Sequence, residues 1–312
     1  MKIRTPSRIH ITLVDLNGSS GRIDGGVGLA LDDPYVLIKA RESDAVEIKG
    51  DPINLERFKL SAHRMYEKFK NGIEIDVQSD YRPHVGLGSG TQISLAVGKA
   101  YNDIYDLNLG IREIAKLMGR GGTSGIGVAA FEVGGFIVDG GHSKKEKTDF
   151  LPSSASKAKP GPIISRLEFP EWDVVLATPD LTGFFGRREV NLFQNYCPIP
   201  LQDVRKLCHV ILMNLLPGVA EVDLDEVSKA IGEIQRIGFK RIEIEQYGDL
   251  IKGCLELSEC CGMSSTGPTV YAFTDTNSKG IAREFKGYFR DRGFECETLV
   301  TKARNRGAKI EN

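Results

Sequence analysis

Alternating polar and apolar residues mark the first fifty positions and predict β-strands joined by hairpins. Residues 8–14 read Arg-Ile-His-Ile-Thr-Leu-Val, which places Arg8, His10 and Thr12 on one face of a strand. The same alternation occurs twice more before residue 50 and predicts two further strands. Two basic side chains on one strand face could hold an anionic substrate, although a solvated sheet face would show the same pattern.

Apolar residues at helical spacing follow after residue 50. They predict helices over 51–70 and 91–104, a strand over 73–78 between them, and a short helix over 112–118. The composition changes at 143–162, where Ser, Lys and Pro are frequent and apolar residues are few. That stretch is predicted to be a surface loop.

The second half mixes strands with helices, which predicts an α+β layer with a largely antiparallel sheet. A capping box, Asp223-x-x-Glu226, starts one helix, and residues 304–312 are predicted to fray. Residues 181–189 are interpreted as a loop that could face a site. The other predicted elements are strands at 172–179 and 297–302 and helices at about 200–215, 224–237, 243–259 and 278–292.

A glycine-rich loop lies between the strand at 73–78 and the helix that follows it. Gly86, Gly88 and Gly90 are interleaved with Ser89 and followed by Thr91. Glycine lets the backbone approach a ligand, and a helix start offers unpaired N–H groups, so this loop is predicted to bind phosphate or pyrophosphate. It matches neither of the two common nucleotide-binding fingerprints, and a tight turn at a crowded helix–sheet contact is the alternative.

Two further glycine-rich stretches supply candidate polar groups. In the stretch 119–135, Arg120 could reach a phosphate, and Thr123 or Ser124 could cap a short helix. In the earlier stretch, Asp24 could hold a magnesium ion or a ribose hydroxyl. An Asx turn in a β-hairpin is the alternative for Asp24.

The overall composition restricts the class of partner. The chain has 312 residues, a net charge of −1 and 41% hydrophobic residues, which suits two domains or one large α/β unit and offers no basic surface for nucleic acid or anionic membrane. No apolar run is long enough to cross a membrane, and the start does not resemble a signal peptide, so we expect a cytoplasmic protein. The six cysteines show no C-x-x-C spacing, which gives no support for a zinc or redox site.

Three stretches together resemble the GHMP kinase superfamily in order and spacing. They are Thr-Pro-Ser-Arg at 5–8, the glycine loop at 83–91, and Ser-Ser-Thr-Gly-Pro at 264–268. The resemblance implies a two-domain α+β fold. The N-terminal β/α domain with the phosphate loop would span 1–160, and a ferredoxin-like C-terminal domain would span 161–312.

One departure from that superfamily bears on the reaction. The kinases share a Ser-Gly-x-Asp stretch whose Asp is the catalytic base, and here the matching residues read Ser124-Gly125-Ile126-Gly127. Glycine at position 127 cannot take a proton from an alcohol. The phosphate-binding loop is thus retained, whereas the base for phosphoryl transfer is missing.

The longer motifs at 6–10, 22–28 and 119–127 resemble one branch, the β-ribofuranosylaminobenzene 5′-phosphate synthases. That family is archaeal and acts in tetrahydromethanopterin biosynthesis. Its members are pentosyltransferases that join phosphoribosyl pyrophosphate to 4-aminobenzoate or 4-hydroxybenzoate and release carbon dioxide and pyrophosphate. The resemblance therefore implies small-molecule substrates, a Mg²⁺ cofactor and a homodimer.

Candidate roles follow from the residues and the resemblance together. Arg8, His10 and Asp24 are the candidate catalytic residues, and Asp24 and Ser89 are the candidate magnesium ligands. The alternatives are a small-molecule kinase of the same superfamily, with Asp24 as its base, or a member that binds a ligand without catalysis. The predicted substrate-binding residues are Gly86, Gly88, Ser89, Gly90, Thr91, Arg120, Thr123 and Ser124.

Overall fold

The computed structural model describes residues 1–123, 125–152, 155–156 and 158–311. Its first part is built on two sheets. One has the strand order β14-β1-β4-β6-β5, and the other has the order β2-β3-β7-β9 with β8 paired to β3. Their strands are β1 (Lys2–Arg4), β2 (Ser7–Asp15), β3 (Arg22–Leu31), β4 (Leu37–Ser43), β5 (Val46–Lys49), β6 (Gly72–Ser79), β7 (Phe136–Asp139), β8 (His142–Ser143), β9 (Ile163–Leu167) and β14 (Lys309–Glu311).

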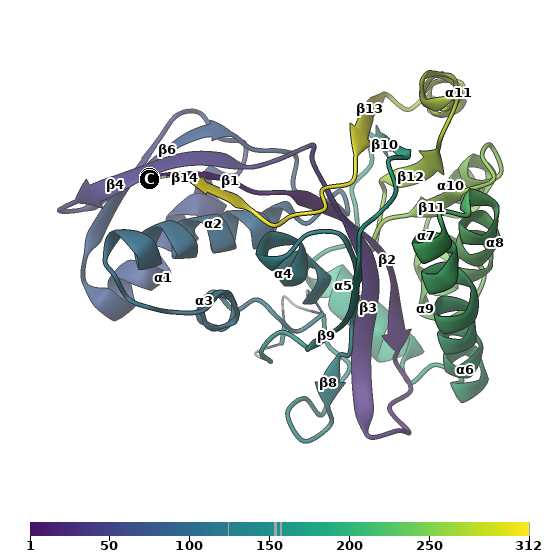
Figure 1. Cartoon of the computed structure of the whole chain (residues 1–312), viewed down its shortest axis with the longest axis horizontal. Helices are drawn as coiled ribbons and strands as arrows, with labels where there is room; N and C mark the ends of the chain where they lie inside the picture. The colour runs from purple at the N-terminus through teal and green to yellow at the C-terminus, as the bar shows by residue number, and fades with distance from the viewer. Residues whose placement is uncertain (124, 153–154, 157, 312) are drawn as a thin grey trace.

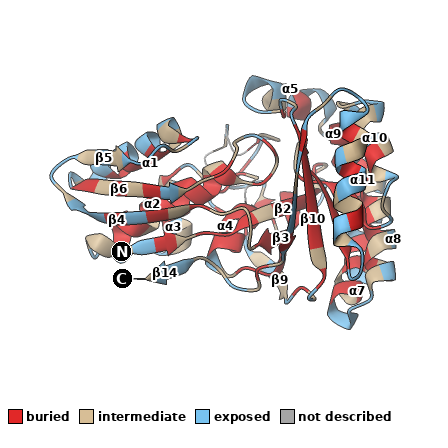
Figure 2. Cartoon of the chain, turned by 90° about the horizontal axis from the view of Figure 1, so that it is seen from above, coloured by how far each residue is buried: buried red, intermediate tan, exposed pale blue. Residues whose placement is uncertain are grey.

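Four helices pack with these sheets: α1 (Leu55–Phe69), α2 (Ser89–Ile104), α3 (Ile111–Leu117) and α4 (Gly125–Glu132). The helices α2 and α4 are the most deeply buried of the four, and α4 is almost entirely red in Figure 2. Burial of nearly every face explains why α4 is apolar all round rather than amphipathic. The strands β2 and β3 form a long hairpin between the two parts of the molecule (Figure 1).

The second part contains an antiparallel sheet with the order β11-β12-β10-β13. Its strands are β10 (Asp173–Pro179), β11 (Cys261–Met263), β12 (Val270–Thr274) and β13 (Cys296–Lys302). Around it lie α5 (Arg187–Tyr196), α6 (Leu201–Val210), the π-helical turn η1 (Ile211–Leu215), α7 (Leu216–Glu221), α8 (Leu224–Ile234), α9 (Gly238–Glu245), α10 (Asp249–Leu255) and α11 (Ser278–Arg290). The predicted α+β architecture is confirmed.

One hydrophobic core joins the two parts. Phe169 stands at the junction, with its ring 5.9 Å from that of Phe136 in β7 and 4.9 Å from that of Phe273 in β12. Trp172 meets Phe169 edge-to-face at 5.4 Å. Each buried aromatic ring removes a large apolar area from water, so this cluster fixes the two parts against each other.

Two strands from beyond residue 160 pair with the first part. β9 pairs with β7, and β14 pairs with β1, where Ile310 faces Ile3. The prediction that residues 304–312 fray is therefore wrong for the described residues up to 311, because β14 completes the edge of the first sheet. A boundary between domains at residue 160 stays a prediction.

Most predicted helices are confirmed, with two corrections. The predicted helix 243–259 is two helices, α9 and α10, because Gly248 precedes α10 with a φ of +58° that breaks the helical path. The stretch interpreted as a loop at 181–189 ends in the first turn of α5. Half of the predicted capping box of α8 is present, since the Asp223 carboxylate accepts from the Glu226 amide at 2.9 Å. The other half is not formed, because the Asp223 amide donates to the carbonyl of Gly218 and the Glu226 carboxylate accepts from Asn214. None of the described helices is both long and apolar enough to cross a lipid bilayer.

Candidate active site

Three segments that are distant in the sequence meet where β2 begins. The hydroxyl of Ser264 donates to the carbonyl of Gly86 at 2.7 Å, and the guanidinium of Arg8 donates to the same carbonyl. The amide of Ser265 donates to the carbonyl of His10 at 2.7 Å. These bonds tie together the N-terminal strand, the glycine loop and the late Ser-Ser-Thr-Gly-Pro segment, the same three stretches that carry the sequence resemblance.

A cavity of about 650 Å³ opens at this junction. The structure thus brings together most of the residues predicted from the sequence. Ser124 lies outside the described residues, and Asp24 does not line the cavity. The predicted residues that do line it are Arg8, His10, Gly86, Gly88, Ser89, Gly90, Thr91, Arg120 and Thr123.

The glycine loop delivers the first turn of α2 to this cavity. Gly86 and Gly88 have φ values of +88° and +83°, a conformation that L side chains rarely adopt. The amide of Thr91 bonds to the carbonyl of Gly88 at 3.1 Å, whereas those of Ser89 and Gly90 find no acceptor among the described residues. Free amides at a helix start, with its partial positive charge, are suited to bind an anion.

Three arginines reinforce the positive charge around the loop. Arg8, Arg57 and Arg120 all line the cavity, and no carboxylate in the described part of the chain lies within ion-pair distance of any of them. A Cβ placed on Gly90 would lie 3.2 Å from Nη2 of Arg120 and 3.6 Å from Nε of Arg57. Burial, together with the neighbouring Arg57 and Arg64, lowers the pKa of Arg120 to about 10. Among the described residues, these three guanidinium groups therefore form no direct ion pair with a carboxylate.

Sequence reasoning missed Arg57. It lies in α1, where the repeating pattern predicts a helix, and charged residues on helices most often face solvent. No local signal distinguishes Arg57 from the other charged residues of that helix. Only the packing of α1 beside α2 brings its guanidinium over the glycine loop.

A buried ion pair lies beside His10. Lys240 pairs with Glu243 at 2.6 Å and donates to the carbonyl of Ser265 at 2.7 Å. The Nε2 atom of His10 is buried without a hydrogen-bond partner among the described residues. Burial, with the charges of Arg8 and Lys240, lowers the pKa of His10 well below its usual value, so its ring is neutral at pH 7. Sequence reasoning missed both Lys240 and Glu243.

Aromatic side chains form another wall of the cavity. Phe184, Phe185 and Phe193 line it from the loop before α5 and from α5 itself. Phe185 stacks on the ring of His84 at 3.9 Å, and Phe184 meets the ring of Tyr247 edge-to-face at 5.3 Å. The loop at 181–189, which the sequence suggested could face a site, lines this cavity.

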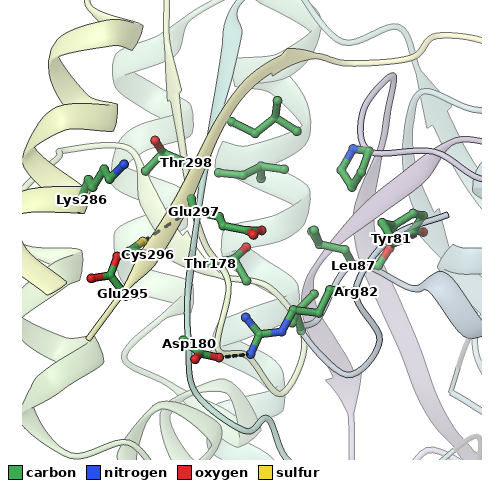
Figure 3. A pocket seen from close by; sticks show the side chains of 14 residues that line it. Tyr81, Arg82, Leu87, Thr178, Asp180, Lys286, Glu295, Cys296, Glu297 and Thr298 are labelled. Carbon is green, nitrogen blue, oxygen red and sulfur yellow. Dashed lines mark hydrogen bonds and ion pairs between the residues drawn. The ribbon is translucent and has the colours of Figure 1, made fainter. Parts of the chain in front are cut away.

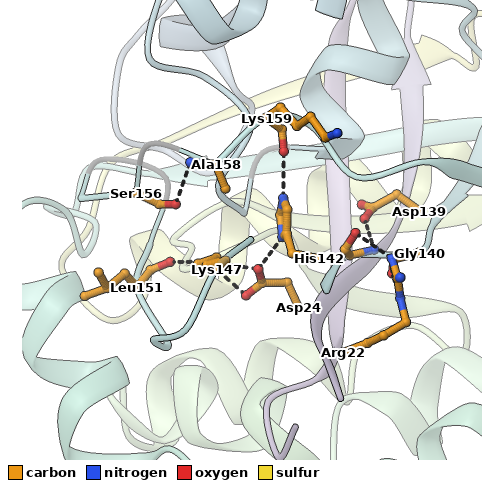
Figure 4. Close-up of polar contacts among 11 residues, drawn as sticks. Arg22, Asp24, Asp139, Gly140, His142, Lys147, Leu151, Ser156, Ala158 and Lys159 are labelled. Atoms are coloured by element: carbon orange, nitrogen blue, oxygen red, sulfur yellow. Dashed lines mark hydrogen bonds and ion pairs between the residues drawn. The ribbon is translucent and has the colours of Figure 1, made fainter. Parts of the chain in front are cut away.

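Asp24 forms a buried ion pair away from this cavity (Figure 4). Its buried carboxylate accepts from Nζ of Lys147 at 2.8 Å and lies 2.6 Å from Nδ1 of His142. Lys147 also donates to the carbonyl of Leu151, and Nε2 of His142 lies 2.8 Å from the carbonyl of Lys159. Asp24 therefore anchors the segment that follows β8, and the structure does not place it with the other candidate catalytic and magnesium-binding residues.

This anchor makes stability depend on pH. Burial lowers the pKa of His142, but the hydrogen bond and charge of Asp24 outweigh burial and leave the pKa above its usual value. A pKa raised by folding stabilises the folded state below pH 6.5, and this contribution is lost as the pH rises through the folded pKa. We therefore expect His142→Gln to lower the free energy of unfolding, and to lower it more at pH 6 than at pH 8.5. Urea titrations at both pH values measure this, and a pH-independent difference would contradict it.

The position of the missing kinase base contains no acidic side chain. A Cβ on Gly127 would lie 3.3 Å from Cγ2 of Thr91, so little room remains there. The nearby acid is Asp139, whose Oδ2 would lie 2.7 Å from a Cβ on Gly125. Asp139 accepts from the amide of Gly141, burial raises its pKa to about 6, and it does not line the cavity. In the described part of the chain, the acidic residues that line the cavity are Glu56, Glu189 and Glu243, and each comes from a different segment than the kinase motif.

A second cavity, of about 820 Å³, lies on the other side of the glycine loop (Figure 3). Leu87 and Tyr81 line it on one side, and β13 lines it on the other. The hydroxyl of Tyr81 donates to the carbonyl of Leu87 at 3.2 Å. None of the residues predicted from the sequence lines this cavity. The glycine loop therefore lies between two cavities, and its glycines line the cavity of about 650 Å³.

The fold and the glycine loop before α2 are those of the GHMP kinase class. Residues 56–135 match the family description "GHMP kinases N terminal domain". Phosphomevalonate kinase of Streptococcus pneumoniae has a similar solved structure, with a TM-score of 0.68, 14% identity and coverage of 96% of this chain and 99% of that chain. The mevalonate kinase of Methanococcus jannaschii has a TM-score of 0.60 at 13% identity, covering 98% of each chain. At these identities the likeness concerns the fold.

Closer relatives define the branch. β-Ribofuranosylphenol 5′-phosphate synthase of Archaeoglobus fulgidus is 65% identical over 311 residues, covering 100% of this chain and 99% of that protein. The protein of the same name from Methanocaldococcus jannaschii is 44% identical over 330 residues, covering 99% and 100%. The chain belongs to the β-ribofuranosylphenol 5′-phosphate synthase family. The resemblance seen in the sequence is confirmed.

Proposed function

We propose that this chain condenses phosphoribosyl pyrophosphate with 4-hydroxybenzoate or 4-aminobenzoate and releases carbon dioxide and pyrophosphate. The named relatives support a β-ribofuranosylphenol 5′-phosphate synthase. The observation that carries the proposal in this chain is a single cavity lined by arginines, by the first turn of α2 with its free amides, and by aromatic rings. Glycine also stands at position 127, where the kinases have their base. Such a site is suited to a sugar diphosphate and an aromatic acid rather than to deprotonation of an alcohol.

The proposed reaction needs charge stabilisation and positioning more than a strong base. As the bond between ribose C1′ and pyrophosphate breaks, the leaving oxygen keeps the electron pair and C1′ gains positive charge. The ring carbon that bears the carboxylate then bonds to C1′, and loss of carbon dioxide returns an electron pair to the ring. The protein must stabilise the pyrophosphate, align the two substrates and exclude water.

The residues at the glycine loop suit the leaving group. The amides of Ser89 and Gly90 with Arg57 and Arg120 would bind the pyrophosphate, and Arg8 would lie close to the reacting centre. Preorganised donors of this kind stabilise charge that develops in the transition state. The ribose 5′-phosphate is not assigned to particular residues.

We further propose that Mg²⁺ binds together with the diphosphate group of phosphoribosyl pyrophosphate. The described residues contain no group of three His, Cys, Asp or Glu side chains that could hold a metal. Mg²⁺ commonly keeps several waters and binds through substrate phosphates with one or two protein ligands. The hydroxyl of Ser89, which lines the cavity, is suited to such a role, whereas the carboxylate of Asp24 is already ion-paired. Bound to pyrophosphate, the ion would supply charge neutralisation.

A homodimer and a cytoplasmic location are parts of the same proposal. The homodimer rests on the family resemblance alone. The location is supported by the six cysteines, all of which are unpaired. Reduced thiols are typical of proteins in a reducing compartment.

The test follows carbon dioxide released from carboxyl-labelled 4-hydroxybenzoate. We expect one carbon dioxide and one pyrophosphate per turnover only when phosphoribosyl pyrophosphate is present, and loss of turnover when EDTA removes divalent cations. Formation of ADP from ATP with an alcohol acceptor would instead indicate a kinase. Binding of ligand without release of either product would indicate a member without catalysis.

A further inference from the structure

The cavity has two chemically different ends. At the end beside the glycine loop, the walls are backbone amides and the guanidinium groups of Arg57 and Arg120. At the other end, the cavity is lined by Phe184, Phe193 and Glu243. Phe193 packs on Phe239 and Phe184 on Tyr247, which lie four residues before and four residues after Glu243, so both rings lie on the stretch that carries this carboxylate. Such a division matches two substrates, one polyanionic and one aromatic, held side by side.

The aromatic end is held rigidly. The hydroxyl of Thr266 donates to the carbonyl of Phe184 at 3.1 Å, and the hydroxyl of Tyr247 donates to the carbonyl of Thr266 at 2.7 Å. Phe193 is 2% exposed and packs on Phe239 at 4.7 Å between ring centroids. Rings fixed in this way form a preorganised apolar surface for another planar ring.

Glu243 is the buried carboxylate of this end. Three acidic residues line the cavity, and of them Glu56 is exposed and Glu189 is half-buried, whereas the side chain of Glu243 is 7% exposed. Its Oε2 atom pairs with Lys240, and no partner of Oε1 is seen in the described part of the chain. A carboxylate oxygen has more than one acceptor position, so Glu243 can accept a further hydrogen bond from a ligand.

We propose that the aromatic acid binds with its ring against Phe184 and Phe193, and that Glu243 accepts a hydrogen bond from its para hydroxyl or amino group. This inference rests on the proposed function and adds the position and orientation of the acceptor substrate. The carboxyl-bearing carbon, at the opposite end of the ring, then points toward the glycine loop. Arg8 bonds to the carbonyl of Gly86 in the glycine loop and interacts electrostatically with Glu243, so it contacts the loop and senses the charge at the aromatic end.

The chemistry requires an acceptor at this position. When the ring carbon bonds to C1′, the ring becomes cationic, and the para oxygen or nitrogen carries much of that charge. Its O–H or N–H proton becomes acidic and is shared with Glu243. When carbon dioxide leaves, the electron pair returns to the ring and the proton returns to the para group. No net proton is gained or lost, so no other acid or base is needed.

The ion pair with Lys240, at 2.6 Å, favours the charged form of Glu243. Burial raises the pKa of Glu243 above its usual value, and the ammonium of Lys240 opposes part of this rise. Lys240 is itself held by the carbonyl of Ser265. A carboxylate that is charged, buried and held in place interacts more strongly with a developing positive charge than one in water does.

The experiment combines one enzyme substitution with one substrate substitution. Glu243→Gln removes the negative charge, and with it the ability to share the proton, while it keeps the shape. The substrate 4-methoxybenzoate keeps the electron-donating oxygen but has no O–H to donate. With 4-hydroxybenzoate, we expect Glu243→Gln to lower kcat about a hundredfold. With 4-methoxybenzoate, kcat of the wild type should be lower than with 4-hydroxybenzoate by a similar factor. Glu243→Gln should lower kcat for 4-methoxybenzoate by less than about threefold relative to the wild type with the same acid.

A matched control lies on the same helix. Glu245 pairs with Arg241 at 3.9 Å on the surface and does not line the cavity, so Glu245→Gln should behave as the wild type with both acids. Equal losses in Glu243→Gln with the hydroxy and methoxy acids would overturn the inference. If the wild type releases no carbon dioxide from any acid, the proposed function itself fails, and this inference fails with it.

A second variant tests the ring position without touching the buried ion pair. Phe184→Ala should raise KM for 4-hydroxybenzoate about tenfold, because the contact between the two rings is lost. KM for phosphoribosyl pyrophosphate should stay within twofold of the wild type. A larger change for the sugar diphosphate than for the aromatic acid would place the ring elsewhere and overturn the assignment, whether or not Glu243→Gln folds.

Discussion

Gly86→Ala is expected to lose at least about a thousandfold in kcat/KM and to melt more than about 5 °C below the wild type. Gly86 has a φ of +88°, and a Cβ there would lie 2.3 Å from the carbonyl oxygen of Ser264. The backbone strain costs about 1–2 kcal/mol, and the overlap adds about 1–3 kcal/mol. Because Ser264 and Arg8 both bond to the Gly86 carbonyl, relief of the overlap must also displace the loop.

Gly21→Ala is the matched control for this prediction. Gly21 has a φ of +83°, and a Cβ there would meet nothing within 4 Å. This variant carries the same backbone strain without the overlap, so the difference between the two isolates the contact between loop and Ser264. Thermal melting and initial rates of carbon dioxide release measure it. Equal activity of the two variants would show that the junction of the three segments does not position the site.

The glycine loop at this junction could be predicted from the sequence because the signals for it are local. Glycines that recur at alternate positions directly before a helix, as Gly86, Gly88 and Gly90 do, indicate a backbone with a positive φ or a close approach to another group. The strand before the loop and the helix after it follow from the period of their apolar residues. Nine of the predicted site residues consequently line one cavity.

The partners of Asp24 could not be predicted in this way. Asp24 is separated from Lys147 by 123 residues and from His142 by 118 residues. A carboxylate in a glycine-rich stretch is equally consistent with metal binding, a turn or a buried ion pair. Only the tertiary arrangement of β3 and β8 selects the ion pair. Arg57 and Glu243 show the converse case, in which residues of ordinary helical segments become part of the site through packing.

The errors in the fold have a similar origin. The chain after β13 returns to pair with β1, and this pairing spans nearly the whole sequence, so no local pattern reports it. Polar residues near a chain end usually indicate fraying, and here the edge of a sheet provides partners for their backbone groups. The split of the predicted helix at Gly248 shows that apolar periodicity can continue through a break in the backbone.

Arg120→Met is expected to stabilise the unliganded protein while it weakens substrate binding. The guanidinium of Arg120 is buried near Arg57 and Arg64, its Nε has no partner among the described residues, and its pKa falls to about 10. The folded protein therefore holds a charge at a cost of roughly 1–3 kcal/mol. Methionine avoids that cost, so the melting temperature without ligand should rise by several degrees.

The same substitution should weaken phosphoribosyl pyrophosphate binding about a hundredfold, since a charge-assisted hydrogen bond to a polyanion contributes about 2–3 kcal/mol. The ligand-induced rise in melting temperature should shrink accordingly, because it depends on the ratio of ligand concentration to Kd. Scanning calorimetry with and without pyrophosphate or phosphoribosyl pyrophosphate measures both effects in one experiment.

Arg64→Met separates repulsion from binding. Arg64 contributes to the same positive cluster, donates to the carbonyl of Met118 and does not line the cavity. Arg64→Met should therefore leave the ligand-induced rise in melting temperature close to that of the wild type. Arg57→Met should reduce this rise, as Arg120→Met does. Destabilisation of unliganded Arg120→Met together with a normal ligand-induced shift would mean that the arginines are structural. A gain in stability with loss of binding is the result expected when a protein keeps unpaired charge for a polyanionic substrate.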